Sequence, residues 1–422
     1  MSILGDLLSV LFERRDRQSE TLTQGVRPVS ELVEELVGGR GEISGRAIAN
    51  QILEAFGAMS DTEKLEFFRF VSSELDLSPT AVREALEAYE NKPGKATYRN
   101  FMAATEPKRQ ELIRRLNQVP GATGSLVNMR ADLLRLGSKA PEAESIMALD
   151  IDFRHLFASW FNRGFLVLRP ISWESPANIL EKIIAYEAVH AIGSWDDLRS
   201  RLEPADRRCY AFFHPAMPDE PLIFVEVALS HGIPNSVQEL LADNREPLEP
   251  GEADTACFYS ISNCQSGLAS ISFGNSLIKQ VVSDLRQDVP NIKTFVTLSP
   301  IPALTRWFKG EEGLSEPATA EGVRTLAAHY LLNAKRPDGG PYDPVARFHL
   351  GNGARVHAVH AEADTSERGR AQSFGAMVNY LYDLDRINEN HERFAIKREI
   401  VATDDVLKLS QNVEELSVLR SD

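Results

Sequence analysis

Two side chains that lie far apart in the sequence, Ser299 and His349, have the types needed for catalysis. Ser299 follows the apolar run 292–298, and His349 lies in the apolar stretch 343–353, close to a glycine turn. An imidazole in such a place can act as a general acid or base. Each residue also has a structural alternative. A serine before a proline commonly forms a turn, and a histidine in apolar surroundings is commonly a hydrogen-bonded core residue.

Other histidines and tyrosines have weaker patterns. His357 and His360, with Asp364, suggest a metal site, but on a strand their spacing places the two imidazoles on opposite faces. Tyr380 and Tyr382 share one strand face, where packing is the simpler function and a hydroxyl lining a pocket is the alternative. Three further histidines fall at the ends of predicted elements and are typical of caps or core polar groups: His190, His214 and His231.

Several motif-defined enzyme classes are disfavoured. The sequence has no Ser–His–Asp order, no Gly-x-Ser-x-Gly elbow and no HExxH motif, which argues against covalent and zinc hydrolases. The turn at 262–270 is poor in glycine, so neither a Rossmann nor a P-loop signature is met.

Residues 256–307 predict the unit that positions Ser299. Residues 257–261 indicate a buried strand, 262–270 a small polar turn, and the region after Gly274 an amphipathic helix. A second strand over 292–298 completes a crossover unit, which is nearly always right-handed with parallel strands. The turn and Ser299 should therefore meet at the carboxyl end of the sheet, where open α/β sheets bind ligands. The helix N-terminus there can direct backbone N–H groups toward an anion.

The rest of the chain divides into a helical and a mixed part. Amphipathic helices joined by short loops predict an all-helical bundle over residues 1–150, with 137–144 as the candidate linker. Residues 151–422 predict an α/β (mixed α+β) domain with a sheet of about six or seven strands. Its strands are expected at 165–168, 209–213, 222–229, 257–261, 292–298, 355–361 and 379–384, with helices at 177–186, 195–202 and 323–332.

Composition limits the classes of partner that the chain is expected to bind. The 422 residues carry a formal net charge of −15, which argues against nucleic acid as a partner. No apolar run is long enough to span a bilayer, and the N-terminus lacks the basic start of a signal peptide, so no membrane partner is expected. Three cysteines without a CxxC pair suit a reducing compartment. We therefore expect a soluble intracellular protein.

Six segments, in order along the chain, resemble the malonyl-CoA decarboxylase family. They are 207–215 (RRCYAFFHP), 257–262 (CFYSIS), 265–268 (QSGL) with Gly274 and 277–279 (LIK), 298–302 (LSPIP), 343–353 (DPVARFHLGNG) and 377–380 (MVNY). The helical first part also has a counterpart in this family. The resemblance thus covers nearly the whole chain.

The resemblance implies a helical domain used for self-association, which would make the protein a homo-oligomer, a dimer or tetramer. It also implies a catalytic domain with the GNAT fold of the GCN5-related acyltransferases and a mixed, mostly antiparallel twisted sheet. Its catalytic serine and histidine fall on Ser299 and His349. Its CoA-contacting loop falls on Ala269, Ser270, Ile271, Ser272, Phe273, Gly274 and Asn275. Ser270 and Ser272 stand where animal members have Gly and Glu. The chain ends without a peroxisomal tripeptide, so the cytoplasm is the expected location.

The activity implied by the resemblance is conversion of malonyl-CoA to acetyl-CoA and carbon dioxide. Ser299 would hold the malonyl group and His349 would protonate the carbon, although the sequence leaves open which of them handles the proton. Lys279 and Arg306 are candidate cations for the CoA phosphates. No metal or organic cofactor is expected. Two alternatives stay open, a CoA-dependent acyltransferase of the same fold and a non-catalytic acyl-CoA-binding scaffold.

Overall fold

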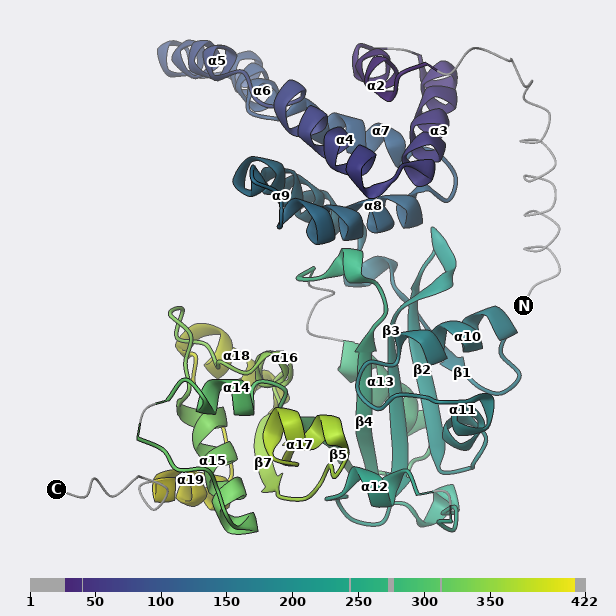
Figure 1. Cartoon of the computed structure of the whole chain (residues 1–422), viewed down its shortest axis with the longest axis vertical. Helices are drawn as coiled ribbons and strands as arrows, with labels where there is room; N and C mark the ends of the chain where they lie inside the picture. The colour runs from purple at the N-terminus through teal and green to yellow at the C-terminus, as the bar shows by residue number, and fades with distance from the viewer. Residues whose placement is uncertain (1–26, 40, 243, 272–276, 312, 414–422) are drawn as a thin grey trace. The chain divides into compact units, whose positions relative to one another are not determined.

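The computed structural model describes residues 27–39, 41–242, 244–271, 277–311 and 313–413 (Figure 1). The chain forms two compact units. The first takes the residues up to Ala122 together with Leu136–Leu149, and the second takes Thr123–Arg135 and everything from Asp150 onward. The two helices α8 and α9 therefore contribute residues to both units. The predicted boundary near residue 150 stays a prediction.

The first unit is helical, as the spacing of its apolar residues predicts. Ser60 forms a complete capping box with Glu63, and Ser78 caps a helix that begins with Pro79. The helices are α2 (Val29–Val37), α3 (Glu42–Ala58), α4 (Asp61–Glu74), α5 (Pro79–Asn91), α6 (Lys95–Ala104), α7 (Lys108–Leu116), α8 (Ala122–Gly137) and α9 (Ala143–Trp160).

The core of the first unit lies between α2, α3, α4 and α7. Phe56, Phe67 and Phe68 form a cluster of edge-on and tilted rings, with centroids 5.2 to 6.0 Å apart. By contrast α5 and α6, which are described over their whole length, contain no buried residue. Tyr98 and Met102 on α6 are about half exposed. These two helices leave an apolar face uncovered within this unit.

The second unit is built on one mixed sheet of eight strands, in the order β1-β2-β3-β4-β5-β8-β6 with β7 also paired to β8. Only β4 and β5 run parallel; the other described pairs are antiparallel. The strands are β1 (Val167–Ile171), β2 (Arg207–His214), β3 (Met217–Ser230), β4 (Thr255–Asn263), β5 (Thr294–Thr297), β6 (Ser299–Pro300), β7 (Arg355–His360) and β8 (Met377–Leu381).

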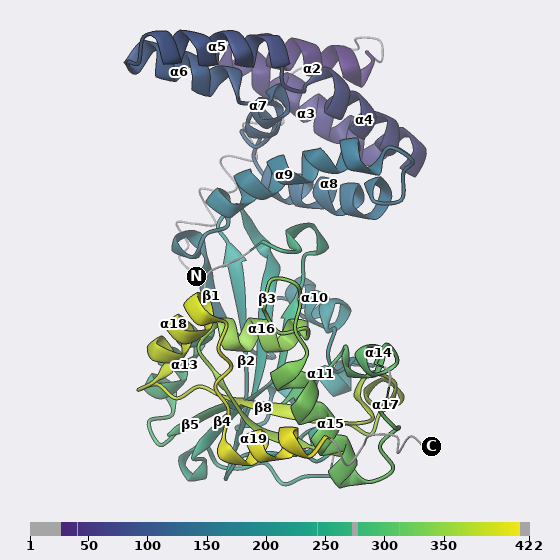
Figure 2. The same cartoon turned by 90° about the vertical axis from the view of Figure 1, so that its left-hand side faces the viewer.

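Short helices surround this sheet. In Figure 2, α15 lies beside α19, and the ring of His329 on α15 bonds the carbonyl of Ser410 on α19. The helices are α10 (Ala177–Tyr186), α11 (Trp195–Leu202), α12 (Val237–Leu240), α13 (Leu277–Asp288), α14 (Leu304–Phe308), α15 (Ala320–Asn333), α16 (Pro344–Gly351), α17 (Glu367–Ser373), α18 (Ile387–Lys397) and α19 (Asp404–Gln411). Three 3-10 turns, η1 (Arg163–Phe165), η2 (Pro250–Glu252) and η3 (Ser266–Leu268), complete the described elements.

The predicted crossover unit is confirmed. Strand β4 pairs in parallel with β5, from Thr255 opposite Thr294 to Phe258 opposite Thr297, and α13 connects them. The mixed α/β fold with a helical N-terminal part is also confirmed. The sheet has more strands than predicted, because the two residues Ser299 and Pro300 pair with Val378 and Met377 of β8. The sequence suggested only a turn there.

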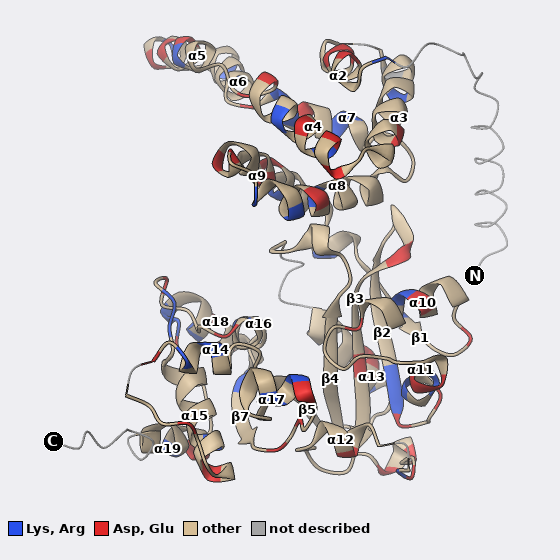
Figure 3. Ribbon diagram, in the orientation of Figure 1, with Lys and Arg blue, Asp and Glu red and all other residues tan. Residues whose placement is uncertain are grey.

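Charged residues of both signs lie on the helices of the first unit. Figure 3 shows Lys and Arg interspersed with Asp and Glu along the helices of the first unit. Within the described ranges, no helix has both the length and the apolarity needed to cross a bilayer.

Candidate functional site

Ser299 and His349, 50 residues apart in the sequence, meet in the core of the second unit. Ser299 lies just past the end of β5 and begins β6. His349 lies near the end of α16, whose first turn is capped by Asp343 through bonds from the Val345 and Ala346 N–H groups. Ser299 Oγ is 3.2 Å from His349 Nε2. Both side chains are nearly inaccessible, with exposed fractions of 5% and 2%.

The surrounding hydrogen bonds assign the proton on His349. The Ser299 hydroxyl donates to Thr297 Oγ1 at 2.8 Å. Its oxygen is thus available to accept the Nε2–H of His349. The other ring nitrogen, Nδ1, then accepts from the Tyr382 hydroxyl at 2.7 Å. Both nitrogens of a neutral imidazole are satisfied, which holds the ring in one orientation.

Burial decides the charge of this imidazole. Removal from water lowers the pKa of His349 from 6.5 to about 3. Burial also raises the pKa of Tyr382 well above its usual value, so this hydroxyl keeps its proton. The resting site at neutral pH therefore holds an uncharged histidine.

Tyr380 forms the wall behind the imidazole. Its ring stacks on that of His349 with centroids 4.6 Å apart and 22° between the planes. Its hydroxyl is buried without a hydrogen-bond partner in the described part of the chain. A buried phenol normally has a partner, so this hydroxyl is available to a bound molecule. The shared face of Tyr380 and Tyr382 in the sequence was the only signal of their place at the site.

Thr297 and Asn379 hold the serine side of the site. Thr297 Oγ1 accepts from the Tyr380 N–H at 3.2 Å, and Asn379 donates to the Thr297 carbonyl at 2.8 Å. The amide oxygen of Asn379 lies 2.5 Å from His360 Nε2. His360 therefore supports the site indirectly, through its bond to Asn379. Sequence reasoning missed Thr297 and Asn379, because their contacts depend on strands distant in the sequence.

The described contacts do not support a metal site at His357, His360 and Asp364. His360 bonds Asn379, while Asp364 accepts from Gln238 and from the Ser366 N–H. His357 Nδ1 is buried without a hydrogen-bond partner among the described residues. No group of three or more His, Cys, Asp or Glu side chains in the described ranges could hold a metal ion.

The predicted CoA-contacting loop is described only in part. Ala269, Ser270 and Ile271 line a cavity of about 270 Å³ together with residues of β3 and the end of β4. Ser272, Phe273, Gly274 and Asn275 lie outside the described residues. Ser270 has a φ of 63°, in the left-handed region that costs a non-glycine residue about 1–2 kcal/mol. Ser299 and His349 are not among the lining residues of this cavity.

A buried arginine on α8 anchors this loop. Arg130, 1% exposed, donates from Nη1 to the carbonyls of Gly267 at 2.7 Å and Ala269 at 3.0 Å. Its Nε bonds Asp150 at 2.7 Å. A Cβ at Gly267 would lie 1.8 Å from the carbonyl oxygen of Val127, so only glycine fits against α8. All these residues belong to the second unit. No motif in the sequence indicated this contact.

The two candidate cations lie on the elements that follow the loop and Ser299. Lys279 is in the first turn of α13 and donates to the side-chain oxygen of Asn388 at 2.9 Å. Arg306 is on α14, the helix that follows β6. Each therefore starts from the carboxyl end of the β4–α13–β5 unit, where the turn and Ser299 also lie.

Comparison with known proteins assigns the family. The malonyl-CoA decarboxylase C-terminal domain matches residues 164–321 and 314–419, and the malonyl-CoA decarboxylase N-terminal domain matches residues 76–161. The chain belongs to the malonyl-CoA decarboxylase family. A relative from Anser anser anser, named a mitochondrial malonyl-CoA decarboxylase, is 35% identical in an alignment of length 361 that covers 74% of this chain and 71% of that protein.

Solved structures of the family agree in fold. A malonyl-CoA decarboxylase from Rhodopseudomonas palustris is 46% identical, with a TM-score of 0.85 over 90% of this chain and 98% of the other. One from Agrobacterium vitis is 45% identical, with a TM-score of 0.84 over 90% and 99%. The predicted family is thereby confirmed.

Replacing Arg130 by methionine should destabilise the second unit. The substitution leaves Asp150 and two loop carbonyls without their donor, and breaking a buried ion pair costs about 3–5 kcal/mol. The free energy of unfolding, measured in urea, should fall by that amount.

Arg135→Met on the same helix is the matched control. Arg135 pairs with Asp132 while 47% exposed, so its loss should cost no more than about 1 kcal/mol. Equal losses in the two variants would show that the contacts of Arg130 with the loop contribute nothing special.

Proposed function

We propose that this chain converts malonyl-CoA to acetyl-CoA and carbon dioxide. The observation that carries the proposal is the buried contact between Ser299 and His349, 3.2 Å apart, in a member of this family. A hydroxyl and a neutral imidazole together offer what the reaction requires. One group holds the malonyl end, and the other supplies a proton in a site shielded from water.

The reaction breaks the bond between the malonyl carboxylate and the adjacent carbon. Its electron pair enters the thioester as an enolate, and carbon dioxide leaves uncharged. The bond must stand perpendicular to the thioester plane for this to happen. We assign this to the Ser299 hydroxyl, which would turn its proton from Thr297 to an oxygen of the malonyl group and so fix that rotation.

The enolate carbon then needs a proton, which we assign to His349. The Nε2–H passes to the carbon, and the Tyr382 O–H passes its proton to Nδ1 across the 2.7 Å bond. Solvent returns a proton to Tyr382 after the products leave. The carbon of a thioester enolate is a far stronger base than the phenolate that this coupled transfer leaves on Tyr382, so an uncharged histidine suffices as the acid. The low pKa of His349 fits this role.

Substrate binding is proposed for the loop from Ala269 to Asn275. The cavity beside Ala269, Ser270 and Ile271 and the anchoring of the loop by Arg130 support this assignment. Lys279 and Arg306 remain candidates for the CoA phosphates. The thioester itself accepts the electron pair of the broken bond. The proposed reaction therefore requires no metal or organic cofactor.

We also propose that the protein is a homo-oligomer assembled through its helical domain. The half-exposed Tyr98 and Met102 on α6, a helix without any buried residue, support this assembly. Sedimentation equilibrium measures the subunit number.

The cytoplasm remains the proposed location. Three free, buried cysteines support it, and cell fractionation tests it.

Incubation with malonyl-CoA alone should release acetyl-CoA and carbon dioxide.

His349→Ala should lower kcat by about 10²–10⁴-fold through loss of the general acid. Ser299→Ala should lower kcat by about 5–150-fold, corresponding to about 1–3 kcal/mol for a lost buried hydrogen bond. Acetyl-CoA release is followed by chromatography.

His231→Ala is the matched control, because the side chain of His231 is 82% exposed and should not affect the rate. Binding of acetyl-CoA, measured by calorimetry, should be nearly equal in all three variants. Full turnover in His349→Ala would remove this residue from the mechanism, and CoA binding without any turnover in the unmodified protein would favour a scaffold.

Tyr382→Phe should lower kcat by about 5–150-fold while KM changes little. The substitution removes only the hydroxyl that bonds Nδ1, so the tautomer of His349 is no longer held. Kinetics of the purified variant give both constants. A variant that raises KM but keeps kcat would place Tyr382 in substrate binding instead.

Activity should show no loss as pH rises through 6.5. An ordinary histidine loses its proton there, but burial has already lowered the pKa of His349 to about 3, so its neutral form persists from pH 5 to 8. The pKa values of Tyr380 and Tyr382 lie well above 10, so both stay protonated. The measurement is kcat/KM against pH. A tenfold fall per pH unit above 6.5 would instead identify the imidazolium as the reactive form.

A further inference from the structure

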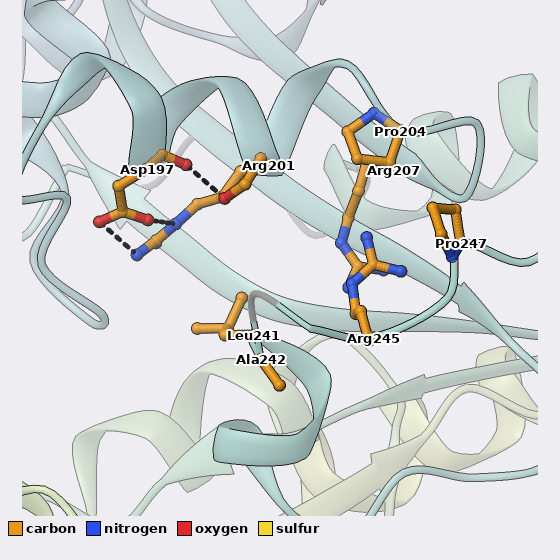
Figure 4. A pocket seen from close by; sticks show the side chains of 9 residues that line it. Asp197, Arg201, Pro204, Arg207, Leu241, Ala242, Arg245 and Pro247 are labelled. Carbon is orange, nitrogen blue, oxygen red and sulfur yellow. Dashed lines mark hydrogen bonds and ion pairs between the residues drawn. The ribbon is translucent and has the colours of Figure 1, made fainter.

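A second cavity lies on the α11 side of the sheet, between the start of β2, helix α11 and the segment after α12. Its volume is about 100 Å³. This is below the roughly 300–1,000 Å³ typical of sites for larger ligands. It leaves room for a few waters or one small ion. Figure 4 shows guanidinium groups on both sides of this cavity, with Pro204, Pro247, Leu241 and Ala242 around them.

Two of these guanidiniums share one carboxylate. Arg245 binds Asp206 through both terminal nitrogens, at 2.5 and 3.1 Å. Arg207, 4% exposed, lies 3.7 Å from the same carboxylate and otherwise bonds the carbonyls of Asp206 and Leu240. Figure 4 shows the two guanidiniums turned toward one another. Burial and the charge of Arg245 lower the pKa of Arg207, which is the mark of an under-compensated cation.

The third guanidinium is balanced more fully. Arg201 donates from Nε to Asp197 at 3.0 Å and from Nη1 to the His190 carbonyl at 2.7 Å. Glu226 lies 3.6 Å from it, but burial and Glu187 raise the pKa of Glu226 to about 8, so it is largely uncharged at pH 7. Among the described residues, the lining and its immediate surroundings thus hold three guanidiniums against two ionised carboxylates, those of Asp197 and Asp206.

We propose that this cavity binds a small oxoanion of the phosphate type between Arg207 and Arg245. A guanidinium carries five N–H donors, and within the described part of the chain only two hydrogen bonds from Arg207 are made to protein oxygens. A tetrahedral oxoanion can accept from both guanidinium planes at once, as charge-assisted hydrogen bonds. It also supplies the negative charge that Asp206 must otherwise divide between two arginines. The enclosing prolines and aliphatic side chains exclude a larger ligand.

The position separates this site from the proposed reaction site. Arg207 pairs with Ala228, which pairs with Cys257, near the amino end of β4. The CoA loop follows Asn263, at the carboxyl end of β4. An anion bound at Arg207 therefore does not compete with the substrate. Its effect is on stability, because a ligand that binds only the folded state shifts unfolding by mass action.

Thermal unfolding of the full chain with inorganic phosphate tests the proposal. The titration is run in saturating CoA, so that sites for the CoA phosphates are already filled, and against sodium chloride of equal ionic strength. We expect a saturable rise in the unfolding midpoint with phosphate only. Arg245→Gln should weaken the apparent phosphate affinity about 10–150-fold, as for the loss of a charged hydrogen-bond partner.

Arg199→Gln is the matched control, since it removes the same charge from an exposed position on α11, where Arg199 pairs with Glu203 and lies over the Trp173 ring. It should keep the phosphate affinity. Ala242→Glu provides a second route, because it adds a carboxylate at the cavity without removing an arginine, and it should also abolish the phosphate effect. A midpoint that rises equally in chloride, or equally in Arg245→Gln and the unmodified protein, would overturn the proposal.

Discussion

The removal of one imidazole from water is the constraint on which the site depends. His349 is uncharged because its surroundings are dry, and it keeps one orientation because both ring nitrogens have partners. An imidazole buried without those partners would cost several kcal/mol. The hydroxyls of Ser299 and Tyr382 therefore stabilise the folded state and define the proton's position at the same time. Stability and chemistry are thus properties of the same hydrogen bonds.

The sheet explains how these partners come together. The parallel pairing of β4 and β5 needs a crossover, and α13 supplies it, so the loop before α13 and Ser299 after β5 lie at one edge. The antiparallel strand β8 then runs along both β5 and β6. This brings Tyr380 and Tyr382 beside Ser299, and α16 packs His349 against them. No single segment contains the site. It exists only when β5, β6 and β8 are paired and α16 is packed against them.

Local sequence pattern predicts part of the fold and of the candidate site, but not all of either. The crossover unit, the capping box at Ser60 and several helix bounds follow from periodicity and caps, which act within a few residues. The Ser299–His349 pair followed from resemblance, because pattern alone favoured a turn former at Ser299 and a hydrogen-bonded core residue at His349. Thr297, Asn379 and Arg130 depend on pairings between distant segments, for which one sequence has no local signal. The two-residue strand β6 was missed for the same reason, since pairing with β8 alone defines it.

Two buried arginine sites in this unit show how similar residues serve different ends. Arg130 has a carboxylate of its own and two carbonyls, so its charge is compensated and its bonds hold a loop. Among the described residues Arg207 has no carboxylate to itself, because Asp206 is engaged at shorter range by Arg245. A structural role alone would favour the first arrangement at both places, since an uncompensated buried charge is costly. That the Arg207 and Arg245 guanidiniums are nevertheless turned toward one another at the wall of a cavity (Figure 4) is what favours the proposed oxoanion site over a purely structural ion pair.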